Sequence, residues 1–333
     1  MSDGSPALSG EDRLIANLFR PLASHPGALA LEDDAAVFSP PAGHDLILTK
    51  DALVAGVHFF PEDLPGAIAR KALRVNLSDL AAKGADAAGF LLALALPADM
   101  EFPWLKDFAF ALGEDATHYA CPLMGGDTVR TPGPLTVSIT AFGTTPSGTM
   151  VQRRGAQPGD RIFVSGTIGD AALGLRLRKG EGAALRLDIR AEEHLLNRYL
   201  LPQPRNVLAH ALRDHASAAM DISDGLVGDL AKLCRVSQVS ADLRVTAVPL
   251  SEAARAALVT NVSLIETVLT GGDDYEVLCT VPESKSTAWS AAAREAGIPV
   301  AEIGRVVEGD QSPRWIDDSG RTLSFTKGAF SHF

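Results

Sequence analysis

The sequence predicts a two-domain protein of the α/β class (α+β type). Its 333 residues exceed what one ordinary hydrophobic core holds and suit two domains. Apolar, strand-like runs alternate with amphipathic helical patterns on both sides of residues 144–160, a segment rich in Gly, Pro and small polar residues. We therefore expect the domain boundary in this segment and divide the chain into residues 1–147 and 148–333.

The first half is predicted to contain three strands and two helices. The strands are apolar runs that end at Gly, Pro or polar residues, and the helices place apolar residues on one face at helical spacing. The predicted strands are residues 45–49, 90–97 and 135–143, and the predicted helices are residues 67–85 and 104–119. Residues 121–133 contain two adjacent glycines and two prolines, so we expect a loop there.

The second half repeats the alternation. The expected elements are a strand at 161–166, a turn and helix at 167–180, a helix at 205–215, and strands at 275–282 and 300–309. Residues 218–233 begin as a buried strand and continue as an amphipathic helix, with Asp221, Asp224 and Asp229 around the junction. Ser223 or Asp224 is expected to cap this helix. Asp221 is expected at the carboxyl end of the strand, where open α/β sheets bind ligands.

The composition excludes several classes of protein. Hydrophobic residues make up 46% and charged residues 21%, which is typical of a globular protein. The net charge of −11, without a run of Lys or Arg, argues against nucleic acid or an anionic membrane as a partner. The first residues are neither basic nor apolar, and no apolar run approaches the length of a membrane span, so we expect a cytoplasmic protein. The three cysteines are too far apart in the sequence to indicate a disulfide framework or a zinc site.

Acidic residues recur at loop and strand-end positions. Each alone has an ordinary structural explanation, such as a turn, a strand end, or an ion pair between Asp79 and Lys83. Together they offer hard oxygen ligands with few Cys or His nearby, which favours Mg²⁺, Mn²⁺ or Ca²⁺. A Mg²⁺ site that serves a nucleotide is the natural use, although the phosphate-binding motif of P-loop kinases is absent. These acids are Asp33, Asp34, Asp51, Asp79, Asp127 and Asp221.

Seven motifs carry a resemblance to a known family. They occur in the order found in thiamine-monophosphate kinases, a family of the aminoimidazole ribonucleotide synthetase and selenophosphate synthetase superfamily. The motifs are EDDAAV, TKDALVAGVHF, KALRVNLSDLAAKGAD, GGDT, GDAALGL, MDISDGLVGDL and GGDDYEVL. The resemblance covers nearly the whole chain. It implies that N-terminal sheets of two chains pair into a barrel in a homodimer, and that a C-terminal α/β domain completes the active-site cleft.

The resemblance also implies a reaction and a set of site residues. The γ-phosphoryl group of ATP, the co-substrate, would pass to thiamine monophosphate with several Mg²⁺ ions bound. Because no side chain resembles an activated nucleophile paired with a base, we expect direct in-line transfer. The implied metal ligands are Asp34, Thr49, Asp51, Asp79, Asp127, Asp221 and Asp224, of which Asp51, Asp79, Asp127 and Asp221 are the candidate catalytic residues. The implied ATP contacts are Gly126, Asp127, Arg153 and Ser223, and the implied substrate contacts are His58, Asp273 and Phe330.

Three departures from the family pattern leave details open. The family commonly has Gly where Glu32 stands, a hydroxyl residue where Lys50 stands, and Glu where Asp273 stands. Lys50 would remove one side-chain ligand or neutralise part of the acid cluster. Two other functions remain: another enzyme of the superfamily that resembles aminoimidazole ribonucleotide synthetase, and a non-catalytic protein that binds divalent metal. No Cys precedes Cys121, which argues against the selenophosphate branch.

Overall fold

The computed structural model of the chain describes residues 10–325, and these residues form two compact units. The first unit comprises the residues up to 76 together with 87–144, and the second comprises 77–86 and the residues from 145 onward. Helix α2 (Pro65–Ala82) therefore supplies residues to both units. Each unit has its own β-sheet with helices, so the predicted mixed α/β class is confirmed.

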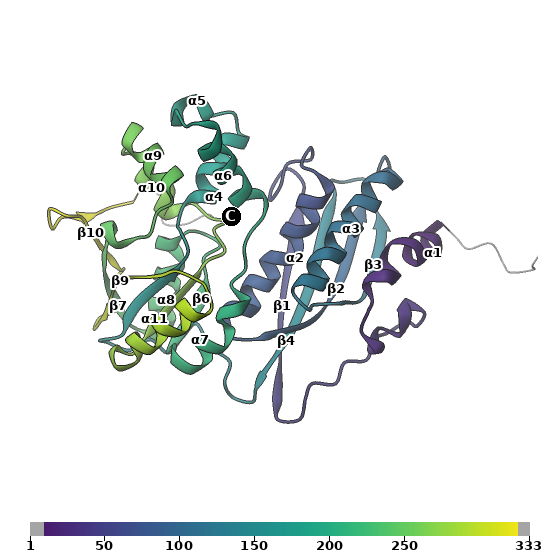
Figure 1. The fold of residues 1–333 in the computed structure, drawn as a ribbon, viewed down its shortest axis with the longest axis horizontal. Helices are drawn as coiled ribbons and strands as arrows, with labels where there is room; N and C mark the ends of the chain where they lie inside the picture. The colour runs from purple at the N-terminus through teal and green to yellow at the C-terminus, as the bar shows by residue number, and fades with distance from the viewer. Residues whose placement is uncertain (1–9, 326–333) are drawn as a thin grey trace, which may run out of the picture. The chain divides into compact units, whose positions relative to one another are not determined.

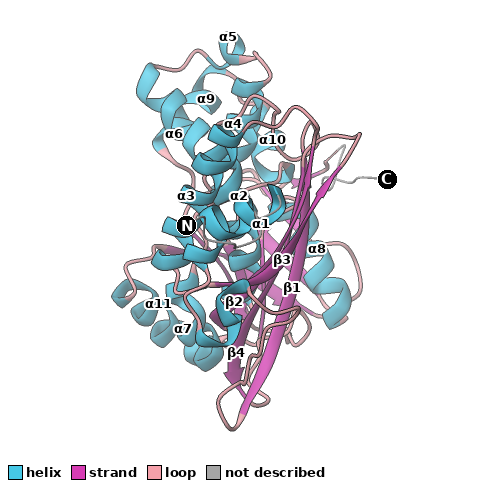
Figure 2. Ribbon diagram, turned by 90° about the vertical axis from the view of Figure 1, so that its right-hand side faces the viewer, coloured by secondary structure: helices cyan, strands magenta, loops and turns pink. Residues whose placement is uncertain are grey.

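The first unit is built on a four-stranded sheet in the order β1-β4-β2-β3. Figures 1 and 2 show α2 and α3 together on one face of this sheet. Both helices bury their apolar stripes completely, as at Ile68 and Leu73 of α2 and at Phe108 and Leu112 of α3. Strands β1 (His44–Val54), β2 (Asp86–Leu96) and β4 (Thr136–Pro146) and helix α3 (Phe102–His118) confirm predicted elements. The fourth strand, β3 (Leu123–Arg130), was not predicted.

Strand β3 corrects the prediction of a loop at residues 121–133. It pairs in parallel with β2, and the register shifts between Phe90 and Leu91, so that Leu92 lies opposite Gly126. A Cβ atom on Gly126 would lie 2.0 Å from the carbonyl oxygen of Leu92. The glycine is thus needed because two strands approach closely, and not because the chain turns. Asp127 consequently lies on a strand.

The second unit contains a seven-stranded sheet in the order β11-β10-β7-β9-β5-β8-β6. Neighbouring strands are antiparallel except β7 and β10, which are parallel. The predicted strands at 161–166, 275–282 and 300–309 correspond to β5, β8 and β9. The bounds are β5 Arg161–Ser165, β6 Ala218–Asp221, β7 Ser240–Arg244, β8 Val277–Val281, β9 Val300–Val307, β10 Arg314–Ile316 and β11 Thr322–Leu323.

Helices cover both faces of this sheet. Ile162 and Val164 of β5 join the apolar core that contains α8, whereas Phe163 between them joins the core that contains α7 and α11. This alternation follows from the two-residue period of a strand. A further cluster is formed by α4, α6, α9 and α10. The helices of this unit are α4 Asp170–Arg178, α5 Gly182–Leu185, α6 Ile189–Leu200, α7 Ala209–His215, α8 Leu226–Ser237, α9 Glu252–Thr260, α10 Leu264–Thr270 and α11 Ser286–Glu295.

The N-terminal part of the first unit is made of short helical turns. These are α1 Gly10–Leu14, followed by η1 Ile15–Phe19, η2 Arg20–Leu22 and η3 Pro26–Leu31. Within residues 10–325, no helix combines the length and apolar character that a membrane span requires.

Candidate active site

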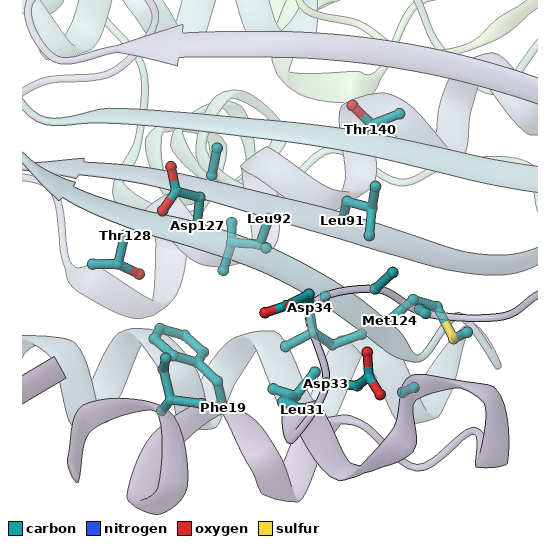
Figure 3. A pocket seen from close by; sticks show the side chains of 18 of the residues that line it. Phe19, Leu31, Asp33, Asp34, Leu91, Leu92, Met124, Asp127, Thr128 and Thr140 are labelled. Atoms are coloured by element: carbon teal, nitrogen blue, oxygen red, sulfur yellow. The ribbon is translucent and has the colours of Figure 1, made fainter. Parts of the chain in front are cut away.

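The first unit contains a cavity of about 720 Å³ bounded by its sheet and by the N-terminal segment. Figure 3 shows Asp127 and Thr128 reaching it from one strand and Thr140 from another, while Phe19, Asp33 and Asp34 approach from the N-terminal segment. Three predicted site residues, Asp34, Gly126 and Asp127, therefore share this cavity. Lys50 and Ser138 also line it, so the wall combines carboxylates, hydroxyls and one ammonium group.

Lys50 is held by a hydrogen bond across the sheet. Its ammonium group donates to the Ser138 hydroxyl at 2.7 Å, and this hydroxyl donates to the backbone carbonyl of Asp51 at 3.1 Å. Because successive side chains of a strand point to opposite faces, Thr49 and Asp51 lie on the face opposite Lys50. Lys50 therefore lies on one face of β1, and Thr49 and Asp51 lie on the other.

His58 lies in the turn after β1. Its Nδ1 accepts a hydrogen bond from the backbone N–H of Val54 at 3.0 Å, and its carbonyl oxygen accepts one from Lys71 at 3.1 Å. A ring nitrogen that accepts an N–H carries no proton, so the proton of the neutral imidazole is assigned to Nε2. The ring is therefore fixed to present Nε2 as a donor.

The second unit brings together two of the predicted metal ligands, Asp79 and Asp221. Asp221 ends strand β6, as predicted, and is only 6% exposed. It accepts a hydrogen bond from the Ser78 hydroxyl at 2.9 Å. Burial, followed by the neighbouring charge of Asp79, raises the pKa of Asp221 well above its usual value. Two acids crowded in this way are a site at which a cation would be stabilised.

Lys83 accompanies this acidic pair. Its ammonium group donates to the carbonyl oxygen of Ala219 at 2.6 Å. Burial lowers the pKa of Lys83 to about 8, and the carboxylate of Asp221 acts in the opposite direction. The sequence suggested only an ion pair between Asp79 and Lys83, four residues apart on one helix. The bond to Ala219 joins residues 136 positions apart, so no local pattern could have revealed it.

The cap of helix α8 differs from the prediction. Gly225, with a φ of 107°, takes the N-cap position and has no side chain to offer. The Asp229 carboxylate instead accepts hydrogen bonds from the backbone N–H groups of Ser223 and Asp224 at 3.0 and 2.9 Å. Neither Ser223 nor Asp224 therefore caps the helix. Lys232 contacts the carboxylates of both Asp224 and Asp229 and so offsets part of the negative charge at this turn.

Asp273 lies beside the same turn. Its backbone N–H donates to the Ser223 carbonyl at 2.9 Å, and the N–H of Tyr275 donates to the Ile222 carbonyl at 2.8 Å. The Asp273 carboxylate accepts a hydrogen bond from the Tyr275 hydroxyl at 3.3 Å. The predicted substrate contact Asp273 and the predicted ATP contact Ser223 are therefore adjacent.

The other predicted residues are placed as follows. Arg153 is exposed, and Phe330 lies outside the described residues. Within residues 10–325, no group of three or more His, Cys, Asp or Glu side chains is placed to hold a metal ion. The seven-residue metal cluster therefore stays a prediction. Ser78, Lys83, Asp229 and Lys232 were not predicted as site residues.

Comparison with known proteins places the chain in a family. Residues 32–145 match the N-terminal domain of the AIR synthase related proteins, and residues 157–316 match the C-terminal domain of the same proteins. A thiamine-monophosphate kinase of Caulobacter vibrioides is 45% identical over 300 residues, which cover 89% of this chain and 84% of the relative. This chain belongs to the thiamine-monophosphate kinase family. The Escherichia coli K12 family member is 38% identical over 97% of this chain and 98% of its own length.

Solved structures of family members agree with this assignment. The crystal structure of the thiamine-monophosphate kinase of Stenotrophomonas maltophilia has a TM-score of 0.82 and 39% identity, covering 94% of this chain and 96% of that one. A structure described as AaThiL complexed with AMPPCP and TMP has a TM-score of 0.77 and 30% identity, covering 99% of this chain and all of that one. Hydrogenase maturation protein HypE of Escherichia coli, at 22% identity, shares the fold.

Proposed function

We propose that this chain transfers the γ-phosphoryl group of ATP to thiamine monophosphate, giving thiamine diphosphate and ADP. The observation that carries the proposal is the alignment over 99% of the chain with a family member that binds AMPPCP and TMP. AMPPCP stands in for ATP, because a methylene group replaces the oxygen between its β- and γ-phosphorus atoms. The two ligands together are the donor and acceptor that such a transfer needs.

The cavity of the first unit suits the phosphate groups of a nucleotide. Asp127 and the glycine before it, both predicted ATP contacts, lie on its wall. Lys50 supplies an ammonium group that can donate to a phosphate oxygen, while its bond to Ser138 sets its position. We infer that this lysine takes over part of the charge neutralisation that a further metal ion would otherwise provide.

The residues present fit Mg²⁺. The donors in the cavity are carboxylate and hydroxyl oxygens, the ligands this hard cation prefers, and Asp79 crowds the buried Asp221 in the second unit. Asp34, Asp127, Asp79 and Asp221 would hold the ions, with the other predicted ligands Thr49, Asp51 and Asp224. Bound Mg²⁺ would neutralise the phosphate oxygens during transfer.

We assign the binding of thiamine monophosphate to His58, Asp273 and Phe330. Arg153 and Ser223 are assigned to ATP. His58 presents an Nε2 donor that suits a phosphate oxygen, and the Asp273 carboxylate suits an amino group of the thiamine ring. The hydroxyl of Tyr275 donates to Asp273 and supports its orientation.

Direct in-line transfer is the route that fits the described side chains. Burial raises the pKa of Cys121 to about 12 and that of Cys234 to about 12, and burial also raises the pKa of Cys279. All three thiols are buried and protonated at neutral pH, so none is an activated nucleophile. Proximity and charge neutralisation then carry the catalysis.

We also propose a homodimer. Apolar side chains of the sheet in the first unit remain exposed, including Leu48 at 64%, Val129 at 48% and Leu91 at 42%. Exposed apolar side chains of this size on one sheet are typical of an interaction surface. Light scattering coupled to size-exclusion chromatography would give twice the chain mass of 34.9 kDa if the proposal holds.

The experiment that tests the activity is an acceptor comparison. Purified protein is incubated with ATP and Mg²⁺ and with thiamine monophosphate, thiamine or an aminoimidazole ribonucleotide precursor, and the products are identified by mass spectrometry. We expect thiamine diphosphate from thiamine monophosphate and no ATP consumption with the other acceptors. ATP consumption only with the aminoimidazole precursor would establish the superfamily alternative. Tight Mg²⁺ binding without nucleotide binding would establish the metal-binding alternative.

A further inference from the structure

The loop that carries Asp273 has a backbone that needs external support. It links α10 to β8 through residues 271–276, and two of its non-glycine residues adopt positive φ angles, 72° at Asp273 and 51° at Tyr275. Such left-handed conformations are unfavourable for residues with a Cβ atom and persist only where the surroundings enforce them. The structure must therefore contain contacts that hold this loop.

One set of contacts converges on the carboxylate of Glu276, which is completely buried. The Ser165 hydroxyl donates to it at 2.6 Å, and the Arg198 guanidinium donates at 2.8 Å. Arg205 contacts both of its oxygen atoms, through Nε at 2.6 Å and through Nη2. Two cations and a hydroxyl from three separate segments thus fix the last residue of the loop.

A second set of contacts holds the residue next to Asp273. Arg198 also donates to the backbone carbonyl of Asp274 at 3.2 Å. The Asp274 carboxylate accepts a hydrogen bond from the backbone N–H of Gly169 at 2.8 Å, at the start of α4. Residues 274 and 276 are anchored by these contacts, whereas the side chain of Asp273 between Gly272 and Asp274 is partly exposed and accepts a hydrogen bond from Tyr275.

This arrangement is a poor way to gain stability. Taking charged groups out of water is costly, and a buried ion pair is often no better for stability than apolar residues of the same size. Within the described residues, Nε and Nη1 of Arg198 are buried without a hydrogen-bond partner, which adds to the cost. A role in fixing one conformation accounts for the network better than a role in overall stability.

We propose that Arg205 and Arg198, acting through Glu276, are positioning residues that hold loop 271–276 in the conformation that presents Asp273 to the acceptor substrate. The inference rests on the proposed function, because it takes thiamine monophosphate as the ligand of Asp273. Both arginines are largely buried and paired with Glu276, so we assign them no direct contact with the substrate. They act by fixing the backbone of loop 271–276, which carries Asp273.

The test uses Arg205→Lys, with Arg198→Lys as a second variant if the first fails to fold. Lysine keeps the charge but cannot contact both oxygens of Glu276. The matched control is Arg74→Lys, because Arg74 pairs with buried Asp115 in the same two-bond manner, at 2.6 and 2.9 Å. The arginine side chain is 14% exposed in both pairs.

The first readout is amide hydrogen exchange, which needs no enzymatic activity. The N–H groups of Asp273 and Tyr275 are hydrogen-bonded to the Ser223 and Ile222 carbonyls and should exchange slowly in the unsubstituted protein. We expect Arg205→Lys to accelerate exchange at these two amides, and Arg74→Lys to leave them unchanged. Unchanged exchange at these two amides in the loop variant that folds would overturn the proposal.

The second readout is kinetic. We expect Arg205→Lys to raise KM for thiamine monophosphate about tenfold, the effect of weakening one contact, and to change KM for ATP less than about twofold. Equal changes in kcat and in KM for both substrates would mean a general loss of structure and would overturn the positioning role. The same changes in Arg74→Lys would have the same meaning. If the unsubstituted protein consumes no ATP with thiamine monophosphate, the proposed function fails, and the exchange readout alone decides whether the arginines hold the loop.

Discussion

Replacing Asp221 by Asn tests the acidic site most directly, because folding and catalysis should respond in different directions. Burial and the charge of Asp79 raise the pKa of Asp221, while the Ser78 hydrogen bond and the Lys83 ammonium act more weakly in the other direction. The ionised carboxylate is therefore destabilised in the folded, metal-free protein. Asn removes this charge and keeps an oxygen that can accept from Ser78.

The magnitude follows from linkage between protonation and folding. A tenfold change in proton affinity corresponds to about 1.4 kcal/mol, and the folded protein binds the Asp221 proton more tightly than the unfolded chain does. The stability of the unsubstituted, metal-free protein thus falls as pH rises from the usual carboxyl value of 3.8 towards the raised pKa of Asp221. We expect Asp221→Asn to raise the free energy of unfolding near neutral pH by about 1 kcal/mol or more.

The assay combines thermal unfolding in a chelator at several pH values with steady-state kinetics in Mg²⁺. We expect kcat to fall about a hundredfold or more, because one electrostatic contact to the transferring group is lost. The matched control is Asp115→Asn, which removes an equally buried carboxylate that is paired with Arg70 and Arg74. It should lower the free energy of unfolding by about 3 kcal/mol and leave the turnover of the folded enzyme unchanged.

Two results would refute this reasoning about Asp221. A variant that is less stable than the unsubstituted protein in chelator would show that the carboxylate is not crowded. A variant with near-normal kcat would show that Asp221 does not belong to the catalytic site.

Three other substitutions test separate features. Gly126→Ala would place a Cβ atom 2.0 Å from the Leu92 carbonyl oxygen, so chemical denaturation should show that the free energy of unfolding falls by about 2–4 kcal/mol. As a control, Gly125→Ala would meet only a leucine methyl group at 3.3 Å and should lower it less. Lys50→Ser removes the ammonium group from the cavity, so calorimetry should show Mg²⁺ binding about three- to tenfold tighter; unchanged affinity would contradict a role of Lys50 in neutralising the acids. Asp273→Asn keeps a residue that tolerates the positive φ but removes the negative charge. KM for thiamine monophosphate should therefore rise about tenfold while KM for ATP stays unchanged. An equal rise in both KM values would argue against a substrate contact.

Local patterns predicted the long elements well. Apolar periodicity located β1, β2, β4 and the helices α2 and α3, because one buried face dictates which residues can occupy each position. The same logic placed Asp221 at the end of a strand. Strand β3 was missed because adjacent glycines usually mark turns, whereas here one of them allows a neighbouring backbone to approach.

The contacts that shape the site were beyond local patterns. The bond from Ser78 to Asp221 joins residues 143 positions apart, and Arg205 and Glu276 are separated by 71 positions. Gly225 takes the N-cap position of α8, and Asp229 inside the helix accepts hydrogen bonds from the backbone N–H groups of the two residues expected to cap it, Ser223 and Asp224. The motifs supplied candidate site residues, but partners of this kind are set by the fold.

The division of α2 between the two units has a consequence for any attempt to express the C-terminal part alone. A fragment of residues 148–333 would lack residues 77–86, which the second unit includes. It would lose Ala82 from one of its apolar cores, the Ser78 hydroxyl from Asp221, and the Lys83 ammonium from the Ala219 carbonyl. The second unit is therefore discontinuous in sequence, and a single cut in the gene cannot give two pieces that each contain all residues of one unit. Recombination between relatives should take residues 77–86 from the same parent as the residues from 145 onward, because a different choice would separate the second unit from part of its own core.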